Sequence, residues 1–479
     1  MATLSDNLQK TIMTVPIGKF EGASINIISA EDNETVIDTG GSAEPRIVSI
    51  VLNESIFQPF IVGTVILDIP NGYLEENKTR ITSQDVLVMS IATFVSMEKT
   101  DVIPGKGFLE SFIIYNTSKS SSSEKTTRYR LDIVTPEGFK DSTTRVVKSF
   151  SKRKRSDIVK NIYTDYIQEE KRLDAGSGNL SFVTETLGSD FSCVLPNWSP
   201  SKCISWITNG SIDSKNEDCV NFFFFQRFND MGRVESVFTS FTDMIKEPVI
   251  GVEDDNTSGY IVDILYDAED PIDAHIRQRR TIKGDFSIPD MNSTKYNAFG
   301  TWGGTLYFYD QTRKKYFEKV YNYTNNAPEP FVDPNTKKFI EEENQIITNR
   351  LGSPDSFKAF IPKQKYLFSD DEKNKGVDKK EDWLDLVYTQ RKLNIYFPLE
   401  INIVGDADRR VGECVMFSDM QVRNLTKDQS SYTSHDQEGR SLGGKYLISD
   451  VQHQFIFEST SVNQEYTTKL TLMRDGAPK

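Results

Sequence analysis

The sequence is poor in the residues from which metal sites and disulfide frameworks are built. Its 479 residues include four cysteines and three histidines, and no two cysteines form a Cys-x-x-Cys pair. A structural zinc needs a close set of sulfur and nitrogen ligands, and a disulfide-stabilised domain needs a far higher share of cysteine. We therefore expect free thiols in a reducing compartment, and neither a metal nor another cofactor.

Phosphate-binding loops are also missing. The sequence has no GxxxxGK[ST] loop and no GxGxxG segment, and the Gly303-Gly304 pair after Trp302 matches neither pattern. These loops place backbone amides against phosphates in nucleotide-binding proteins, and their absence argues against that class. We expect no catalytic residues, no cofactor-binding residues and no enzymatic activity.

No apolar run is long enough to cross a bilayer as a helix. The most apolar stretch, Phe60 to Ile69, falls well short of the ~20 residues that a spanning helix needs. Residues 1–20 mix polar and apolar side chains and lack the basic start and apolar block of a signal peptide. We expect a soluble protein, made in a cytoplasm and not inserted into a membrane.

Positive charge is in deficit. The chain has 56 Lys and Arg residues against 70 Asp and Glu residues, a formal net charge of −14. A nucleic-acid binder normally presents a positive field to phosphates, so tight DNA binding is disfavoured. A negative field would suit a surface past which DNA slides without binding.

The pattern that is present is mainly β at the two ends of the chain. Short segments rich in Val, Ile, Thr and Phe alternate with Gly, Pro and Asn turns, which is typical of antiparallel strands. In 128–133, Tyr129, Leu131 and Ile133 share one face, as in a half-buried strand. The Ser-rich segment 116–125 is predicted to be a connecting loop. The predicted strands are 24–29, 46–52, 60–69, 85–97, 108–115, 128–135, 399–404, 413–417, 446–457 and 466–473.

Two helices and a hairpin are predicted between these ends. Ser156-Asp157 can cap a helix to about residue 170 whose apolar positions fall on one face, and Pro200 suits the first turn of a second helix. Phe222–Phe225, the turn 229–232 and 233–238 predict a hairpin whose first strand is buried on both faces. The middle of the chain is predicted to hold short strands at 304–309 and a helix at 338–350. A charged linker at 369–382, a short helix at 381–390 and a polar loop at 424–442 follow.

Three further features are open to a functional and a structural interpretation. The basic run Lys152–Arg155 could contact phosphates, but a solvated connector ahead of a helix is favoured. His453 shares strand parity with Val451 and Phe455, which favours a hydrogen-bonded core histidine over a catalytic one. The carboxylate runs 341–343 and 370–372 could serve a glycosidase, although both lie in segments that read as exposed.

The C-terminal segment carries a family resemblance. It reads Leu-Glu-Ile-Asn-Ile-Val-Gly-Asp from 399 and Arg-Val-Gly-Glu from 410, and it ends in the pattern G-x-Y-x-I-x-x-V-x-H-x-F…Y-x-T-x-L-x-L-x-R. This resembles the baseplate hub of T-even-type contractile phages and the hub part of type VI secretion spike proteins. The motif residues are Gly405, Asp406, Gly412, Gly444, Tyr446, Val451, His453, Phe455, Tyr466, Leu470 and Leu472.

The resemblance implies a mainly β (α+β) fold with two similar small β-barrel tube domains near the two ends. The inserted regions would be helical and mixed α+β. The implied domains are 1–150 for the first barrel, 151–245 for a helix-helix-hairpin region, 246–380 for a mixed insertion and 381–479 for the second barrel.

The implied function is a homotrimeric symmetry adaptor in the virion baseplate, assembled in the bacterial host cytoplasm. Its partners would be the hexameric tail tube, the trimeric central spike and other baseplate (wedge) proteins, with DNA passing through the ring unbound. Two alternatives from other classes stay open: a cell-wall or polysaccharide hydrolase, and a receptor-binding fibre domain. A hydrolase would have a cleft with a carboxylate pair, and a fibre domain would have exposed aromatic loops.

Overall fold

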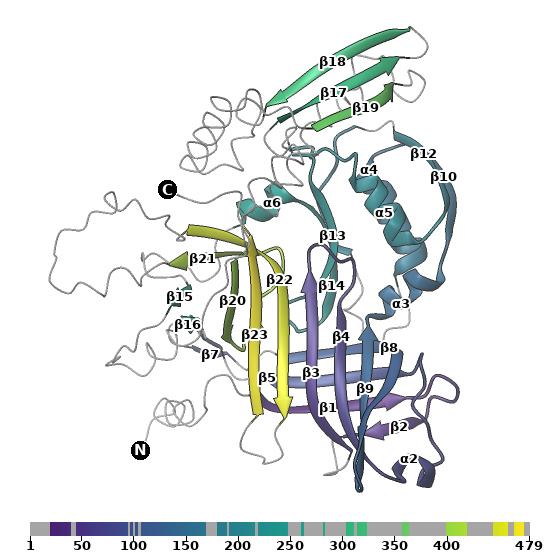
Figure 1. Cartoon of the computed structure of the whole chain (residues 1–479), viewed down its shortest axis with the longest axis vertical. Coiled ribbons are helices and arrows are strands. Elements are labelled where there is room, and N and C mark those ends of the chain that lie inside the picture. The colour runs from purple at the N-terminus through teal and green to yellow at the C-terminus, as the bar shows by residue number, and fades with distance from the viewer. Residues whose placement is uncertain are drawn as a thin grey trace, which may run out of the picture.

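The computed structural model gives the arrangement of the elements in Figure 1. It describes residues 20–39, 45–93, 96–98, 101–103, 107–168, 180–188, 191–215, 219–247, 260–262, 281–282, 303–310, 314–322, 357–363, 399–418, 444–457 and 464–473. The predicted helices at 338–350 and 381–390, the charged linker at 369–382 and the polar loop at 424–442 lie outside these residues.

The N-terminal strands form an antiparallel run in the order β2-β1-β5-β8-β9-β4-β3. β4 shows why they pair in this way, because every second side chain along it is buried. In Figure 1 the strands β3, β4 and β9 run across β1, β5 and β8, and the apolar faces of both groups meet in one core. The strands are β1 (Phe20–Ile28), β2 (Thr35–Asp38), β3 (Arg46–Ser55), β4 (Val62–Pro70), β5 (Val86–Thr93), β8 (Gly107–Ser122) and β9 (Thr126–Val134), with a short helix α2 (Tyr73–Glu76) and a small hairpin of β6 (Ser96–Glu98) and β7 (Asp101–Ile103).

The prediction of a loop at 116–125 is wrong. β8 continues through this segment to Ser122 and pairs with β9, with Thr117 opposite Leu131 and Ser122 opposite Thr127. The turn is confined to Ser123–Lys125 and is closed by the Ser123 N–H, which donates to the Thr126 carbonyl at 2.8 Å. Because β9 satisfies the backbone groups, a polar segment can extend as a strand beyond the core.

The helical region packs against one end of this sheet. The predicted first helix is confirmed as α4 (Arg155–Ile162), which continues as a π-helical turn, η1 (Tyr163–Ile167), and the second as α5 (Pro200–Thr208). Their apolar faces share a core with β10 (Val146–Arg153) and β12 (Phe191–Trp198), which pair with each other. The predicted hairpin is confirmed as β13 (Phe222–Phe228) and β14 (Val234–Ser240); one face of β13 is buried throughout, and on the other face Phe225 is buried while Phe223 and Arg227 are half-buried. The remaining elements are α3 (Pro136–Thr143), β11 (Leu180–Val183) and α6 (Phe241–Lys246).

The C-terminal strands join the N-terminal sheet through β22. This strand pairs with β3 over seven residue pairs, from Asp450 opposite Ser55 to Ile456 opposite Ser49. It also pairs with β23 and β21, so that both ends of the chain belong to one 13-stranded sheet. The strands are β15 (Tyr260–Val262), β16 (Thr281–Ile282), β20 (Leu399–Val404), β21 (Cys414–Ser418), β22 (Gly444–Phe457) and β23 (Gln464–Met473).

Followed from strand to strand, the pairings at the C-terminal end start at one edge of β22 and return to its other edge. They lead from β22 through β21, β15, β16, β20 and β23 and back to β22, although β16 meets β20 only at Ile282 and Ile403. The N-terminal strands show no such return among the described residues, because β2 and β3 end their run without pairing to each other. The mainly β prediction is confirmed, and the arrangement of two similar barrels stays a prediction.

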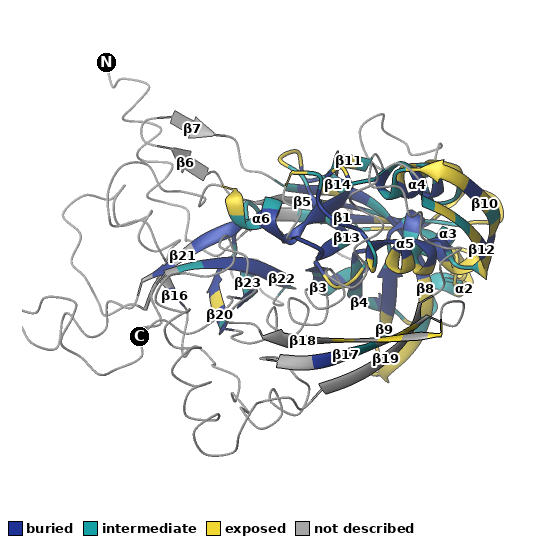
Figure 2. Ribbon diagram, turned by 90° about the horizontal axis from the view of Figure 1, so that it is seen from above, coloured by how far each residue is buried: buried dark blue, intermediate teal, exposed yellow. Residues whose placement is uncertain are grey.

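A separate three-stranded sheet forms part of the middle region. β17 (Gly303–Asp310) lies between β18 (Lys315–Asn322) and β19 (Phe357–Lys363), which confirms the strand predicted at 304–309. Figure 2 shows exposed residues on β17 and β18, in contrast to the buried centre of the large sheet. Among the described residues, no helix combines the length and the apolarity needed to cross a bilayer.

Candidate functional site

The structure brings most of the motif residues together on one hairpin. β22 and β23 place Val451 opposite Leu470 and Phe455 opposite Tyr466. A bulge between Ile448 and Asp450 shifts the alternation of β22, so that Tyr446 is buried as well as Val451 despite their odd spacing. The buried motif residues of this hairpin are Tyr446, Val451, His453, Phe455, Tyr466, Leu470 and Leu472.

His453 is the centre of a buried hydrogen-bonded group that joins the two ends of the chain. Its Nδ1 lies 2.9 Å from the Tyr466 hydroxyl, and its Nε2 lies 3.1 Å from Oε1 of Glu54 on β3. Burial raises the pKa of Tyr466 well above its ordinary value, so the phenol keeps its proton and can donate to Nδ1. In the imidazole tautomer with its proton on Nε2, that nitrogen donates to Glu54. The core-histidine interpretation is confirmed, and all three side chains are 1% exposed or less.

An aromatic cluster surrounds this group. Phe455 stacks on Tyr466 with ring centroids 4.3 Å apart and planes 13° apart. Phe108 of β8 lies 4.9 Å from the His453 ring and 4.7 Å from Phe228 of the β13–β14 hairpin, measured between ring centroids. Three parts of the chain that are distant in sequence therefore share one apolar contact region around a single hydrogen-bonded histidine.

Gly405 lies where its backbone passes close to this cluster, and the other two motif glycines lie in the neighbouring strands and turn. The Gly405 N–H donates to the Tyr466 carbonyl at 3.0 Å, and a Cβ at Gly405 would lie 2.1 Å from the Tyr466 ring. Gly412 has a φ of +83° and donates from its N–H to the Ile448 carbonyl at 2.9 Å. Gly444 starts β22 opposite Phe417. Each glycine therefore belongs to the same local architecture as the hairpin.

Asp406 organises the turn between these glycines. Its N–H donates to the Thr468 hydroxyl at 3.0 Å, and its Oδ1 accepts from the Asp408 N–H at the same distance. Its Oδ2 lies 3.2 Å from Nε of Arg409, and the aspartate side chain is 2% exposed. The carboxylate therefore ties the turn to itself and to β23.

The β13–β14 hairpin is held on the sheet by buried polar side chains that the sequence analysis missed. The Phe228 N–H donates to Oε2 of Glu54 at 3.2 Å, and the Val234 N–H donates to Oε2 of Glu110 at 2.9 Å. Gln226 accepts from the Thr135 hydroxyl at 2.7 Å and from the Ile61 N–H at 3.3 Å. In the sequence, these contacts are indicated only by single polar residues at inward positions of otherwise apolar strands.

A mostly buried group of charges beside the junction was also missed. Arg410 pairs with Asp230 in the hairpin turn, and its Nη1 lies 3.7 Å from Oε1 of Glu413. Burial raises the pKa of Glu413 to about 7, against the opposing effect of Arg410. Oε2 of Glu413 has no hydrogen-bond partner among the described residues. The alternating charges of the 406–413 turn were the available signal for this group.

The basic run is only partly the solvated connector that was predicted. Lys152 and Arg153 are exposed at the end of β10, and Lys154 pairs with Glu185 at 2.9 Å. Arg155, in contrast, packs over the Phe191 ring at 3.6 Å and donates to the Ile207 carbonyl at 3.2 Å. Burial lowers the pKa of Arg155 to about 10, which still leaves it charged at neutral pH.

The polar side chains of the junction hold segments of the chain together and are not open to a substrate. The polar atoms of Glu54, His453 and Tyr466 are bonded to one another beneath the surface. Within the described ranges, no group of three or more His, Cys, Asp or Glu side chains could hold a metal ion. The carboxylate runs 341–343 and 370–372, and a Gly-x-Ser-x-Gly segment at 439–443 of the kind found at nucleophile turns, lie outside the described residues.

No family model matches the chain, and no curated protein matches it. Solved structures that are similar to it include phage tail proteins and a component of a type VI secretion system. A 43 kDa tail protein of a prophage from Shewanella oneidensis is 9% identical, with a TM-score of 0.45, over 95% of this chain and 97% of that one. A tail protein from Neisseria meningitidis is 10% identical, with the same TM-score and coverage.

A third similar structure is an E. coli type VI secretion component described as similar to bacteriophage T4 tail proteins. It is 8% identical, with a TM-score of 0.39, over 94% of this chain and 76% of that one. At TM-scores below 0.5, these likenesses establish neither the family nor the function of this chain.

Proposed function

We propose that this chain is the structural baseplate hub of a contractile phage tail or a related injection machine. It acts as a homotrimer that adapts the sixfold tail tube to the threefold central spike. The observation that carries the proposal is the buried junction of β3, β22 and β23. There the motif residues of the hub resemblance meet residues from the N-terminal sheet around His453.

A hub has to transmit force between two faces without changing shape, and this junction suits that task. A seven-pair ladder between β3 and β22 resists separation of the two ends through backbone hydrogen bonds in parallel. The buried Glu54–His453–Tyr466 group fixes the register, because a shift of β22 by one residue would turn His453 to the other face and leave Glu54 and Tyr466 in the core without it.

The finer parts of the proposal concern symmetry. Two similar tube domains per chain would give a ring with six similar faces from three subunits. The strand pairings that lead from β22 through β16 and β20 to β23 and back to β22 support a small barrel at the C-terminal end. The ring would contact the tail tube, the spike and wedge proteins, without enzymatic activity. The net charge of −14 supports a DNA conduit that repels its cargo.

The mass of the purified chain in solution, together with negative-stain images, tests the proposal. We expect a particle of three times the 54.5 kDa chain mass, with a central opening. A strict monomer that hydrolyses cell-wall polysaccharide would overturn the hub assignment and restore the enzyme alternative.

A second candidate, a receptor-binding role, is favoured by one observation on the β17–β18 pair. Tyr309, Tyr316 and Val320 are 47%, 55% and 63% exposed on one face, and Tyr307 stacks on Tyr316 at 5.6 Å. Exposed tyrosines are enriched at recognition surfaces. Under this alternative, Tyr309→Ser with Tyr316→Ser abolishes attachment to host cells and leaves the oligomeric state unchanged.

A further inference from the structure

The ribbon of β10 and β12 has two dissimilar faces. Its inner face buries Val146, Phe150 and Leu195 in the core of the helical region. On its outer face, Val147 and Val194 are 71% and 69% exposed. The register places Val147 opposite Pro196 and Ser149 opposite Val194, so the two valines are diagonal neighbours on the outer face.

Basic side chains lie at both ends of β10. Arg145 precedes β10, while Lys152 and Arg153 end it, and all three are exposed. None of the three has an ion-pair partner among the described residues, on a chain whose net charge is −14. Lys152 has a φ of +49°, and the ladder with β12 is irregular between Phe150 and Arg153. We call Arg145, Val147, Lys152, Arg153 and Val194 the basic ribbon face.

The ribbon also offers backbone groups. Within the described part of the chain, β10 and β12 pair only with each other, so the outer edge of each strand carries unpaired groups. An apolar centre, a charged rim and open strand edges are the ordinary anatomy of a protein interface. Nucleic acid is a poorer fit, because the two exposed valines at the centre of this surface would then face charged phosphates.

A surface of opposite charge lies at the far end of the same molecule. The turn between β1 and β2 exposes Glu31, Asp32 and Glu34, and α2 exposes Glu75 and Glu76. Arg80, four residues after α2, pairs with Glu31 at 3.5 Å, which brings the two segments near each other. We call these five acidic residues the acidic tip.

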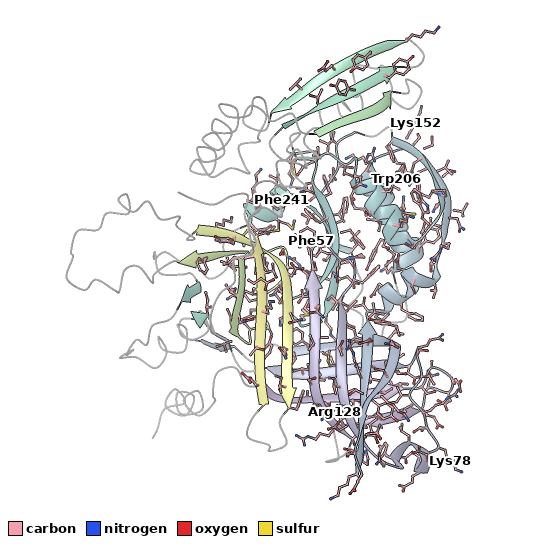
Figure 3. All side chains as sticks on the ribbon, viewed as in Figure 1. Phe57, Lys78, Arg128, Lys152, Trp206 and Phe241 are labelled. Atoms are coloured by element: carbon pink, nitrogen blue, oxygen red, sulfur yellow. The ribbon has the colours of Figure 1, made fainter. Side chains whose placement is uncertain are left out.

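The two surfaces are well separated, which decides the symmetry of their contact. In Figure 3, Lys152 and Lys78, which follows α2, are labelled near opposite ends of the molecule. A surface cannot meet a distant surface of its own chain, and two different surfaces that meet between copies make a head-to-tail contact. Such contacts close into rings when the rotation permits, whereas a self-complementary patch gives a dimer.

We propose that the basic ribbon face docks onto the acidic tip of a second copy of this chain. The contact rests on the proposed ring function and supplies the subunit interface of that ring. The valines occupy its centre, and Lys152 and Arg153 meet the carboxylates of α2 and the β1–β2 turn. Because the charges are solvent-exposed, they set partner orientation and association rate, and salt screens them.

A charge-swap experiment on the full chain tests the contact. Two double variants reverse the charge of one side each: Lys152→Glu with Arg153→Glu, and Glu75→Lys with Glu76→Lys. The four changes are then combined. Lys246→Glu at the end of α6 with Lys314→Glu just before β18 is the matched control, since both lysines are exposed and lie outside the two surfaces. Oligomer mass is measured against protein concentration at low and high salt, with circular dichroism to verify folding.

We expect each double variant on the contact to weaken assembly at least about tenfold, and the combined variant to recover to within about threefold of wild type. The control should assemble like wild type. If the two contact variants assemble like wild type while the wild type is trimeric, this interface is refuted and the hub function stands. If the wild type is monomeric at all concentrations, the proposed function itself falls.

Two further outcomes also overturn the contact. Loss of assembly in both double variants without recovery in the combined variant refutes the pairing of these two surfaces. Loss of binding to a labelled DNA duplex by Lys152→Glu with Arg153→Glu, at unchanged oligomer mass, assigns the basic ribbon face to nucleic acid instead.

Discussion

Replacing Gly405 with alanine tests the close approach at the junction. The backbone of Gly405 is not in the left-handed region, so alanine adds no conformational strain there, and the effect is steric. The new Cβ would lie 2.1 Å from Cγ and Cδ1 of Tyr466. The ring has little room to yield, because it stacks on Phe455 at 4.3 Å and its hydroxyl is bonded to His453 at 2.9 Å.

Overpacking of a well-filled core costs about 1–3 kcal/mol, and we expect the upper end because ring and hydroxyl are both held. Tyr466→Ala alone should cost about 3–5 kcal/mol through the cavity that it leaves. In the double variant the added methyl group enters that cavity. We therefore expect the Gly405→Ala and Tyr466→Ala effects to fall short of additivity by at least about 1 kcal/mol.

Urea denaturation of the four proteins, followed by circular dichroism, gives the free energies of unfolding for this double-mutant cycle. The Tyr466→Ala background is the internal control, since it removes only the group that the methyl would strike. Additivity within about 0.5 kcal/mol, or a cost of Gly405→Ala below that value, would refute the steric argument.

Three other changes probe the same region, each by thermal or urea unfolding. The native pKa of Glu413 is raised to about 7, so wild type loses stability as pH rises from 4.5 to 7.5. The free energy of unfolding of Glu413→Gln should therefore rise by about 3 kcal/mol relative to wild type across that window. A constant difference across pH would contradict this. Gly412→Ala should cost about 2 kcal/mol, since φ is +83° and the Cβ would lie 3.0 Å from Phe225; a neutral result would mean the turn relaxes. Gln226→Leu should cost about 2–4 kcal/mol by leaving the Ile61 N–H and the Thr135 hydroxyl without an acceptor and Glu137 without a donor; a cost below about 0.5 kcal/mol would contradict this.

The sequence predicted what is encoded locally. Apolar periodicity located α4 and α5, turn residues located the β13–β14 hairpin, and strand parity placed His453 in the core. Each of these features depends on residues within a few positions of one another, where sidedness and turn chemistry decide the conformation.

The rest depends on contacts between distant segments. Nothing local in β3 specifies β22 as its partner, and the Glu54 partner of His453 lies 399 residues away. The basic run Lys152–Arg155 was interpreted as a connector, whereas Lys152 and Arg153 belong to β10, which pairs with β12. The polar end of β8 became a strand for the same reason, since its partner and not its composition satisfies the backbone.

The pairing of β3 with β22 has a consequence for the synthesis of the chain. Phe455 and Tyr466 are part of the apolar core of the N-terminal sheet. That core is therefore incomplete until both residues have been synthesised. At about 5–20 residues per second, the edge of β3 waits on the order of 20–80 s on the ribosome for its neighbour. During that time its unpaired groups and apolar face are open to other chains, and a nascent chain stalled before β22 is prone to aggregate. The last strands to be translated therefore set the moment at which the first ones can complete their fold.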